Sequence, residues 1–138
     1  MNRLLLRPSS LLRPTTRAIF SHRATGRMDY SSIATPERCY VDFCLVPVGT
    51  GTLSVAKEVA EVQKLLKASG LTYTMHSAGT TVEGSWDQVM KVVGQAHQAV
   101  HEMGVVRIQS SMRVGTRTDK KQTAADKVKR VEDLLAEK

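Results

Sequence analysis

The chain has 138 residues, the size of one ordinary domain, and 41% of them are hydrophobic. Its net charge of +7 is uneven, because residues 1–38 carry +5 and residues 39–138 only +2. The nearly balanced body argues against a nucleic-acid partner, and no apolar run approaches the roughly 18 residues of a membrane-spanning helix. We therefore expect one domain that binds neither nucleic acid nor membrane.

Residues 1–38 are predicted to be a disordered leader, followed by a domain over residues 39–138. Before Asp29 the leader has six Arg, several Ser and Thr, and no Lys or acid, a composition typical of mitochondrial transit peptides. It predicts a protein of the mitochondrial matrix. Alternatively, translation begins at Met28 and the protein is cytosolic.

The first predicted strand covers residues 39–48, which are rich in β-branched and aromatic side chains. Cys39 and Cys44 lie five positions apart on this strand and therefore point to opposite faces. They are poorly placed for a disulfide or a shared metal. After a loop at 49–52, Ser54 is predicted to cap a helix that ends at Gly70.

Two further strands are predicted at residues 71–76 and 80–83, joined by a turn at 77–79. Ser85 and Gln88 form a capping-box pattern, which predicts the start of a second helix. This helix has one apolar side and ends at Gly104.

The last predicted strand covers residues 105–114 and is broken by Gly115. Its alternation places Val106 with the apolar set and Val105 with the polar one. A final helix follows Thr123, although Asp119 is an alternative cap.

The order β-α-β-β-α-β with an added C-terminal helix predicts an α+β, ferredoxin-like antiparallel sheet with both main helices on one face. The other face is then bare and mixes apolar with charged side chains. An exposed surface of this kind is typical of a partner interface, and we expect a second copy of the chain to cover it. Its predicted members are Tyr40, Asp42, Cys44, Val46, Glu83, Arg107 and Arg113.

Two polar segments are candidates for function. Residues 76–84 place hydroxyls and the Glu83 carboxylate between two glycines, which suits a small polar ligand and equally suits a hairpin. Arg113, Arg117, Lys120 and Lys121 cluster after the last strand, where they form either a solvated turn or a site for a phosphate or an acid. The four His and two Cys show no zinc spacing, so no metal is expected.

Three motifs together resemble the family of small thiamine-binding proteins with a ferredoxin-like fold. They are His-Ser-Ala-Gly-Thr-Thr-Val-Glu-Gly at 76–84, Gly-Val-Val-Arg at 104–107 and Arg-Val-Gly-Thr-Arg-Thr-Asp-Lys at 113–120. The resemblance covers residues 39–136. It implies a protein without enzymatic activity or cofactor that binds thiamine or its pyrimidine part. It also implies dimers, paired into tetramers, with the ligand near subunit contacts.

On this resemblance Glu83 is the expected acceptor for the cationic ring, with Thr81 beside it and Asp42 as a second carboxylate. Glu83 has a structural alternative, an ion pair with Arg107 or Arg113 across the same face. An enzyme that uses His76 or Glu83 as acid or base, and an interaction domain without a ligand, are further alternatives. The full set of candidate ligand-binding residues is Asp42, His76, Ser77, Gly79, Thr80, Thr81, Glu83, Arg107 and Arg113.

Overall fold

The structure is a computed structural model that describes residues 29–137. A compact unit spans Ala34–Lys138, so it begins five residues before the predicted domain. Ahead of it, η1 (Tyr30–Ser32) forms a single turn of 3-10 helix with Asp29 as its N-cap. The Arg-rich part of the predicted leader lies outside the described residues, and its role as a transit peptide stays a prediction.

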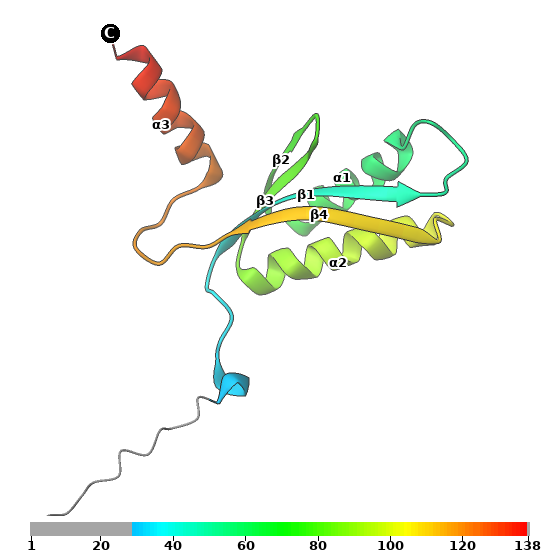
Figure 1. Ribbon diagram of the computed structural model, residues 1–138, viewed down its shortest axis with the longest axis horizontal. Helices are drawn as coiled ribbons and strands as arrows, with labels where there is room; N and C mark the ends of the chain where they lie inside the picture. The colour runs from blue at the N-terminus through cyan, green and yellow to red at the C-terminus, as the bar shows by residue number, and fades with distance from the viewer. Residues whose placement is uncertain (1–28, 138) are drawn as a thin grey trace, which may run out of the picture. The chain divides into compact units, whose positions relative to one another are not determined.

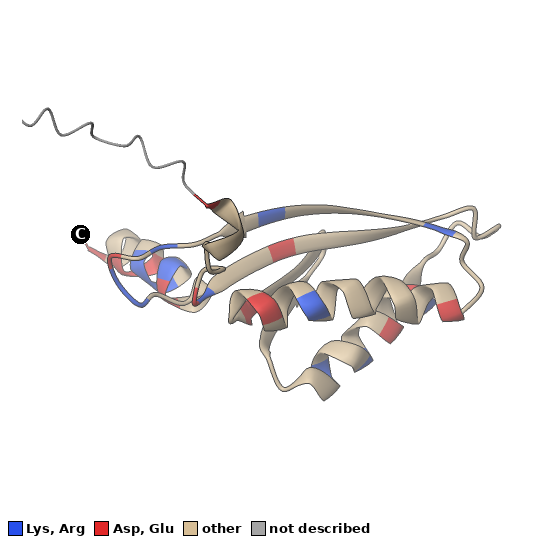
Figure 2. Cartoon of the chain, turned by 90° about the horizontal axis from the view of Figure 1, so that it is seen from below, with Lys and Arg blue, Asp and Glu red and all other residues tan. Residues whose placement is uncertain are grey.

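Four strands of the compact unit form one antiparallel sheet in the order β2-β3-β1-β4. Two helices, α1 and α2, lie together on one side of this sheet (Figures 1 and 2). The predicted ferredoxin-like α+β fold with an extra C-terminal helix is therefore confirmed. The elements are β1 (Cys39–Val48), α1 (Ala56–Ser69), β2 (Thr72–His76), β3 (Gly79–Gly84), α2 (Trp86–Glu102), β4 (Arg107–Gly115) and α3 (Ala124–Ala136).

The hydrophobic core lies between the sheet and the two helices. Alternate residues of β1 point into it, because successive side chains of a strand face opposite sides. The other half of the core comes from α1 and α2, whose apolar residues recur at helical spacing, as the sequence predicts. The most deeply buried side chains are Val41, Phe43, Val62, Leu66, Val82, Val89, Val92, Ala96 and Val100.

The two main helices differ in how well their caps are predicted. At α2, Ser85 is the N-cap and its hydroxyl accepts a hydrogen bond from the Gln88 N–H, as expected. At α1 the prediction is wrong by one residue, because Val55 takes the N-cap position. The Ser54 hydroxyl instead accepts a local hydrogen bond from the Ala56 N–H at 3.3 Å.

The start of β4 also differs from the prediction. Val105 is buried, with 8% of its surface exposed, whereas Val106 is 89% exposed. Both residues precede the strand, which begins at Arg107, so the two-residue alternation of a strand does not apply to them.

Candidate functional site

The face of the sheet opposite α1 and α2 has a polar centre. The strand register places Asp42 of β1 directly between Thr81 of β3 and Arg113 of β4. Thr74 of β2 extends this row beyond Thr81. His76, at the end of β2, belongs to the same face and reaches Asp42 with its side chain.

Asp42 is held by two basic side chains. Its Oδ1 lies 2.9 Å from His76 Nε2, and its Oδ2 lies 2.5 Å from Arg113 Nη2. The Ala78 N–H donates a hydrogen bond of 3.4 Å to His76 Nδ1. Both ring nitrogens are therefore satisfied when Nε2 carries the hydrogen and donates a hydrogen bond to Asp42. Hydrogen bonding to Arg113, and to a smaller degree to His76, lowers the pKa of the Asp42 carboxyl.

This lowered pKa predicts an acid-sensitive contribution to stability. The carboxylate form of Asp42 stabilises the folded chain above the pKa of an unfolded aspartate, about 4. That contribution disappears as the pH falls through the lower folded value. We expect Asp42→Asn to reduce the free energy of unfolding near neutral pH and to reduce it less at about pH 2, where the carboxyl of the unfolded chain is protonated. Denaturant titration at both pH values measures this, and an equal loss at both would contradict it.

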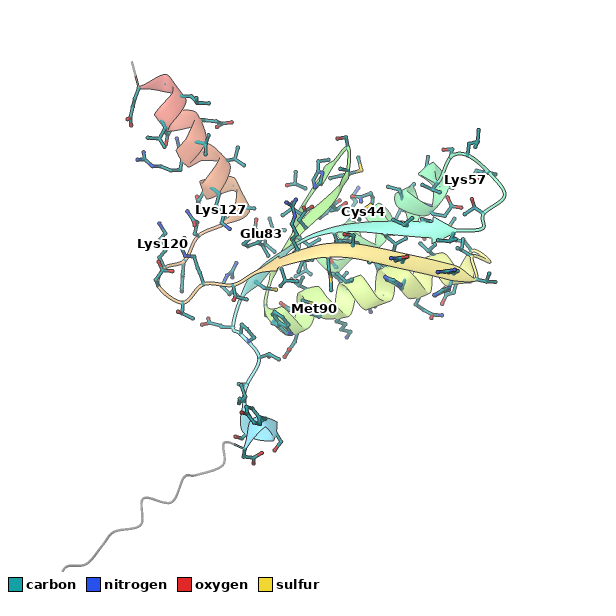
Figure 3. All side chains as sticks on the ribbon, viewed as in Figure 1. Cys44, Lys57, Glu83, Met90, Lys120 and Lys127 are labelled. Atoms are coloured by element: carbon teal, nitrogen blue, oxygen red, sulfur yellow. The ribbon has the colours of Figure 1, made fainter. Side chains whose placement is uncertain are left out.

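Glu83 lies two residues after Thr81 on β3 and therefore on the same face, where it is opposite Tyr40 of β1. Its Oε2 accepts a hydrogen bond of 3.0 Å from the backbone N–H of Ala124, the first residue of α3. A carboxylate is favoured at a helix N-terminus, where backbone N–H groups lack partners within the helix. Glu83 therefore fastens the start of α3 to the sheet, and Figure 3 shows it there.

The N-terminus of α3 also carries its own cap. Thr123 accepts a hydrogen bond from the Asp126 N–H, and the Asp126 carboxylate accepts one from the Thr123 N–H. Asp119, the alternative cap, instead forms an ion pair of 2.7 Å with Arg117. The suggestion that Asp119 caps the helix is therefore wrong.

A pocket of about 700 Å³ opens beside Glu83 at the end of the sheet. Tyr40, Glu83 and Gly115 contribute to its lining. The other lining residues are Ala34, the segments 36–39 and 116–122, and Lys127 of α3. The Lys127 ammonium lies 3.5 Å from the centre of the Tyr40 ring, a cation–π contact. Gly115 leaves room for this ring, because an added Cβ would overlap it.

Four of the nine predicted ligand-binding residues meet at the centre of the uncovered face: Asp42, His76, Thr81 and Arg113. Glu83 lies on the adjacent row. The predicted alternative for Glu83 is not formed, because Arg113 pairs with Asp42 and, within residues 29–137, no ion pair involves Glu83.

Two predicted residues lie away from this cluster. Thr80 is 4% exposed on the helix-covered side, where its hydroxyl accepts a hydrogen bond of 2.9 Å from Gln63 of α1. Its expected place at the ligand rim is therefore wrong, because strand alternation turns it inward. Arg107 shares a strand with Arg113 but lies six residues, or roughly 20 Å, from it.

The hairpin between β2 and β3 contains the remaining two. Ser77 is exposed in the turn, and Gly79 pairs with His76. Gly79 does not have a positive φ, so a left-handed backbone does not explain the glycine. It is needed because there is no room for a side chain: an added Cβ would lie 2.6 Å from the Phe43 carbonyl oxygen. It permits β3 to approach β1 closely.

Sequence reasoning missed two basic residues of the pocket, Lys127 and Arg38. Lys127 has the pattern of an ordinary lysine on the polar side of a helix, and only the position of α3 brings it to Tyr40. Arg38 directly precedes β1 and was assigned to the leader. No local signal in the sequence marks either residue.

No helix among residues 29–137 is long and apolar enough to cross a bilayer. No group of three or more His, Cys, Asp or Glu side chains there is arranged to hold a metal ion. Cys39 is buried and Cys44 is half-buried, and both are free thiols.

Comparison with known proteins gives matches that span nearly the whole compact unit. The sequence profile of the thiamine-binding protein family matches residues 41–132. The UPF0045 protein ECM15 of Eremothecium gossypii is 54% identical over 97 residues, which are 70% of this chain and 92% of that protein. The UPF0045 protein sll0230 of Synechocystis is also 54% identical, over 69% of this chain and 78% of that protein.

Solved structures agree with the fold. The hypothetical protein MJ1052 of Methanocaldococcus jannaschii superposes with a TM-score of 0.64 at 29% identity, over 70% of this chain and 98% of that one. A second solved structure is that of TM0486 of Thermotoga maritima, a proposed thiamine biosynthesis/salvage protein. It superposes with a TM-score of 0.59 at 18% identity, over 68% of this chain and 98% of that one.

Proposed function

Because the chain belongs to the thiamine-binding protein family, we propose that it binds thiamine or a related aminopyrimidine and does not transform it. The observation that carries this proposal is the site itself. A pocket of about 700 Å³, within the size range of small-molecule sites, contains an aromatic ring and a carboxylate next to a row of polar side chains.

The chemistry of the pocket suits such a ligand. Thiamine has a permanently cationic thiazolium and a flat aminopyrimidine that both donates and accepts hydrogen bonds. The Glu83 carboxylate is the partner for the positive charge of the thiazolium. The Tyr40 ring lines the same pocket, with the Lys127 ammonium over it. Thr81 does not line the pocket, but it lies two residues before Glu83 on the same face and offers a hydroxyl to the pyrimidine. None of these contacts requires a metal or a cofactor.

We further propose that the functional form is a homo-oligomer, a dimer or a tetramer. The uncovered face of the sheet carries Val46 and Val48 as exposed apolar side chains beside its polar centre. In addition, α3 has no buried residue and exposes an apolar stripe, defined here as Val128, Val131, Leu134 and Leu135. Surfaces of this kind are typical of contacts between subunits.

Titration calorimetry with thiamine tests the proposed function. We expect the wild type to bind and Glu83→Gln to bind at least about tenfold more weakly, since a hydrogen bond to a charged group contributes roughly 1.5–3 kcal/mol. Glutamine keeps an oxygen for the Ala124 N–H, so the attachment of α3 is retained.

Glu102→Gln is the matched control, because Glu102 is exposed at the end of α2 and does not line the pocket. Equal heats for the wild type and Glu83→Gln would remove Glu83 from the site. Absence of binding by the wild type would reject the proposed function. Consumption of the added compound would favour an enzyme instead.

The subcellular localisation of the protein is a separate proposal that rests on the composition of residues 1–38. The Arg-rich, acid-poor leader supports import into the mitochondrial matrix. A fluorescent reporter fused behind residues 1–30 should colocalise with mitochondria. A reporter that stays in the cytosol would favour the alternative start at Met28.

A further inference from the structure

The pocket beside Glu83 carries more positive charge than its own acids neutralise. Five basic and three acidic residues line it. Of these, Arg117 is engaged by Asp119 at 2.7 Å and also bonds Gln122, while Glu83 accepts from the backbone of α3. Four basic residues remain that form no ion pair within residues 29–137: Arg38, Lys120, Lys121 and Lys127.

These four residues come from three different parts of the chain. Arg38 precedes β1, Lys120 and Lys121 lie in the segment between β4 and α3, and Lys127 belongs to the first turns of α3. Lys120 and Lys127 lie at the same end of the sheet as Glu83 (Figure 3). A solvated turn would explain adjacent lysines, but it does not explain charges from three segments around one pocket.

The position of Lys127 adds a second argument. Its ammonium is held over the Tyr40 ring, which compensates only part of its charge, and no acid pairs with it among the described residues. Like charges that converge on one concave site create a positive potential there. An anion with several acceptor oxygens is the ligand group that best compensates this positive potential.

We propose that this pocket is an anion subsite that receives the phosphate of a phosphorylated ligand. The inference rests on the proposed function, since it assigns the cationic heterocycle of that ligand to Glu83 and its phosphate to the four basic residues that form no ion pair among the described residues. The preferred ligand class is then a phosphate ester of thiamine or of a related aminopyrimidine, rather than the free alcohol. Such a ligand carries both charges, and the pocket offers a partner for each.

The test compares thiamine with thiamine monophosphate by titration calorimetry at one fixed ionic strength. We expect the wild type to bind the monophosphate at least about tenfold more tightly, since charge-assisted hydrogen bonds contribute roughly 1.5–3 kcal/mol each. The variant Lys120→Gln with Lys121→Gln should lose this preference and keep its affinity for thiamine. Both lysines are exposed, so the double variant is expected to fold.

Lys91→Gln is the control, because Lys91 is exposed on α2 and does not line this pocket. It should retain the full preference for the monophosphate. Equal affinity of the wild type for the two compounds, or an unchanged preference in the double variant, would overturn the anion subsite and leave the proposed function intact. Failure of the wild type to bind either compound would overturn both.

Discussion

Replacement of Gly79 by alanine is expected to lower the free energy of unfolding by about 1–3 kcal/mol, the range of overpacked sites. The new Cβ would lie 2.6 Å from the Phe43 carbonyl oxygen and 3.1 Å from its carbon. Both are backbone atoms of a central strand, so they cannot move aside without disturbing the pairing of β1 with β3. The penalty is steric, because Gly79 does not adopt a left-handed conformation.

Gly94→Ala is the matched control for this substitution. Gly94 lies in α2, and an added Cβ there meets nothing within 4 Å. Alanine is a better helix former than glycine, so this variant should be more stable by roughly 0.5–1 kcal/mol. Denaturant titration of both variants should therefore give changes of opposite sign. A Gly79→Ala protein as stable as the wild type would contradict the close approach of the two strands.

The second large effect is expected from α3. Val131 is 57% exposed and Leu135 is 80% exposed, although both belong to the apolar stripe of an amphipathic helix. If another subunit covers the stripe, Val131→Asp buries an unpaired carboxylate in that contact. We expect this variant to sediment with the mass of one chain, whereas the wild type sediments with the mass of two or four.

Ala125→Asp provides the comparison for Val131→Asp. It adds the same charge to the same helix at an exposed position outside the apolar stripe, in the first turn, where acids are favourable. This control should keep the mass of the wild type. A wild type that sediments as a single chain would contradict the proposed oligomer, and so would a Val131→Asp variant that stays assembled.

The sequence predicts the fold well because its periodicities are strong. The alternation along β1 separates Val41 from Asp42 correctly, and the pairing of strands then determines which polar residues share the uncovered face. The same alternation shows why Thr80 was misplaced. It was grouped with its polar neighbours in the motif, whereas its position in the strand turns it toward α1.

The partners of the charged residues could not be predicted in the same way. Whether Arg113 pairs with Asp42 or with Glu83 depends on side-chain geometry that a two-residue period does not contain. The contact of Glu83 with Ala124 joins residues 41 positions apart in the chain. It depends on how the segment after β4 returns to the sheet, for which the sequence has no regular pattern.

Native mass spectrometry of the wild-type chain with added thiamine tests the central claim most directly, because it reports the number of chains and the bound small molecule together. We predict complexes of two or four chains that carry the mass of thiamine. Bare single chains at every thiamine concentration would contradict both the proposed ligand and the proposed assembly.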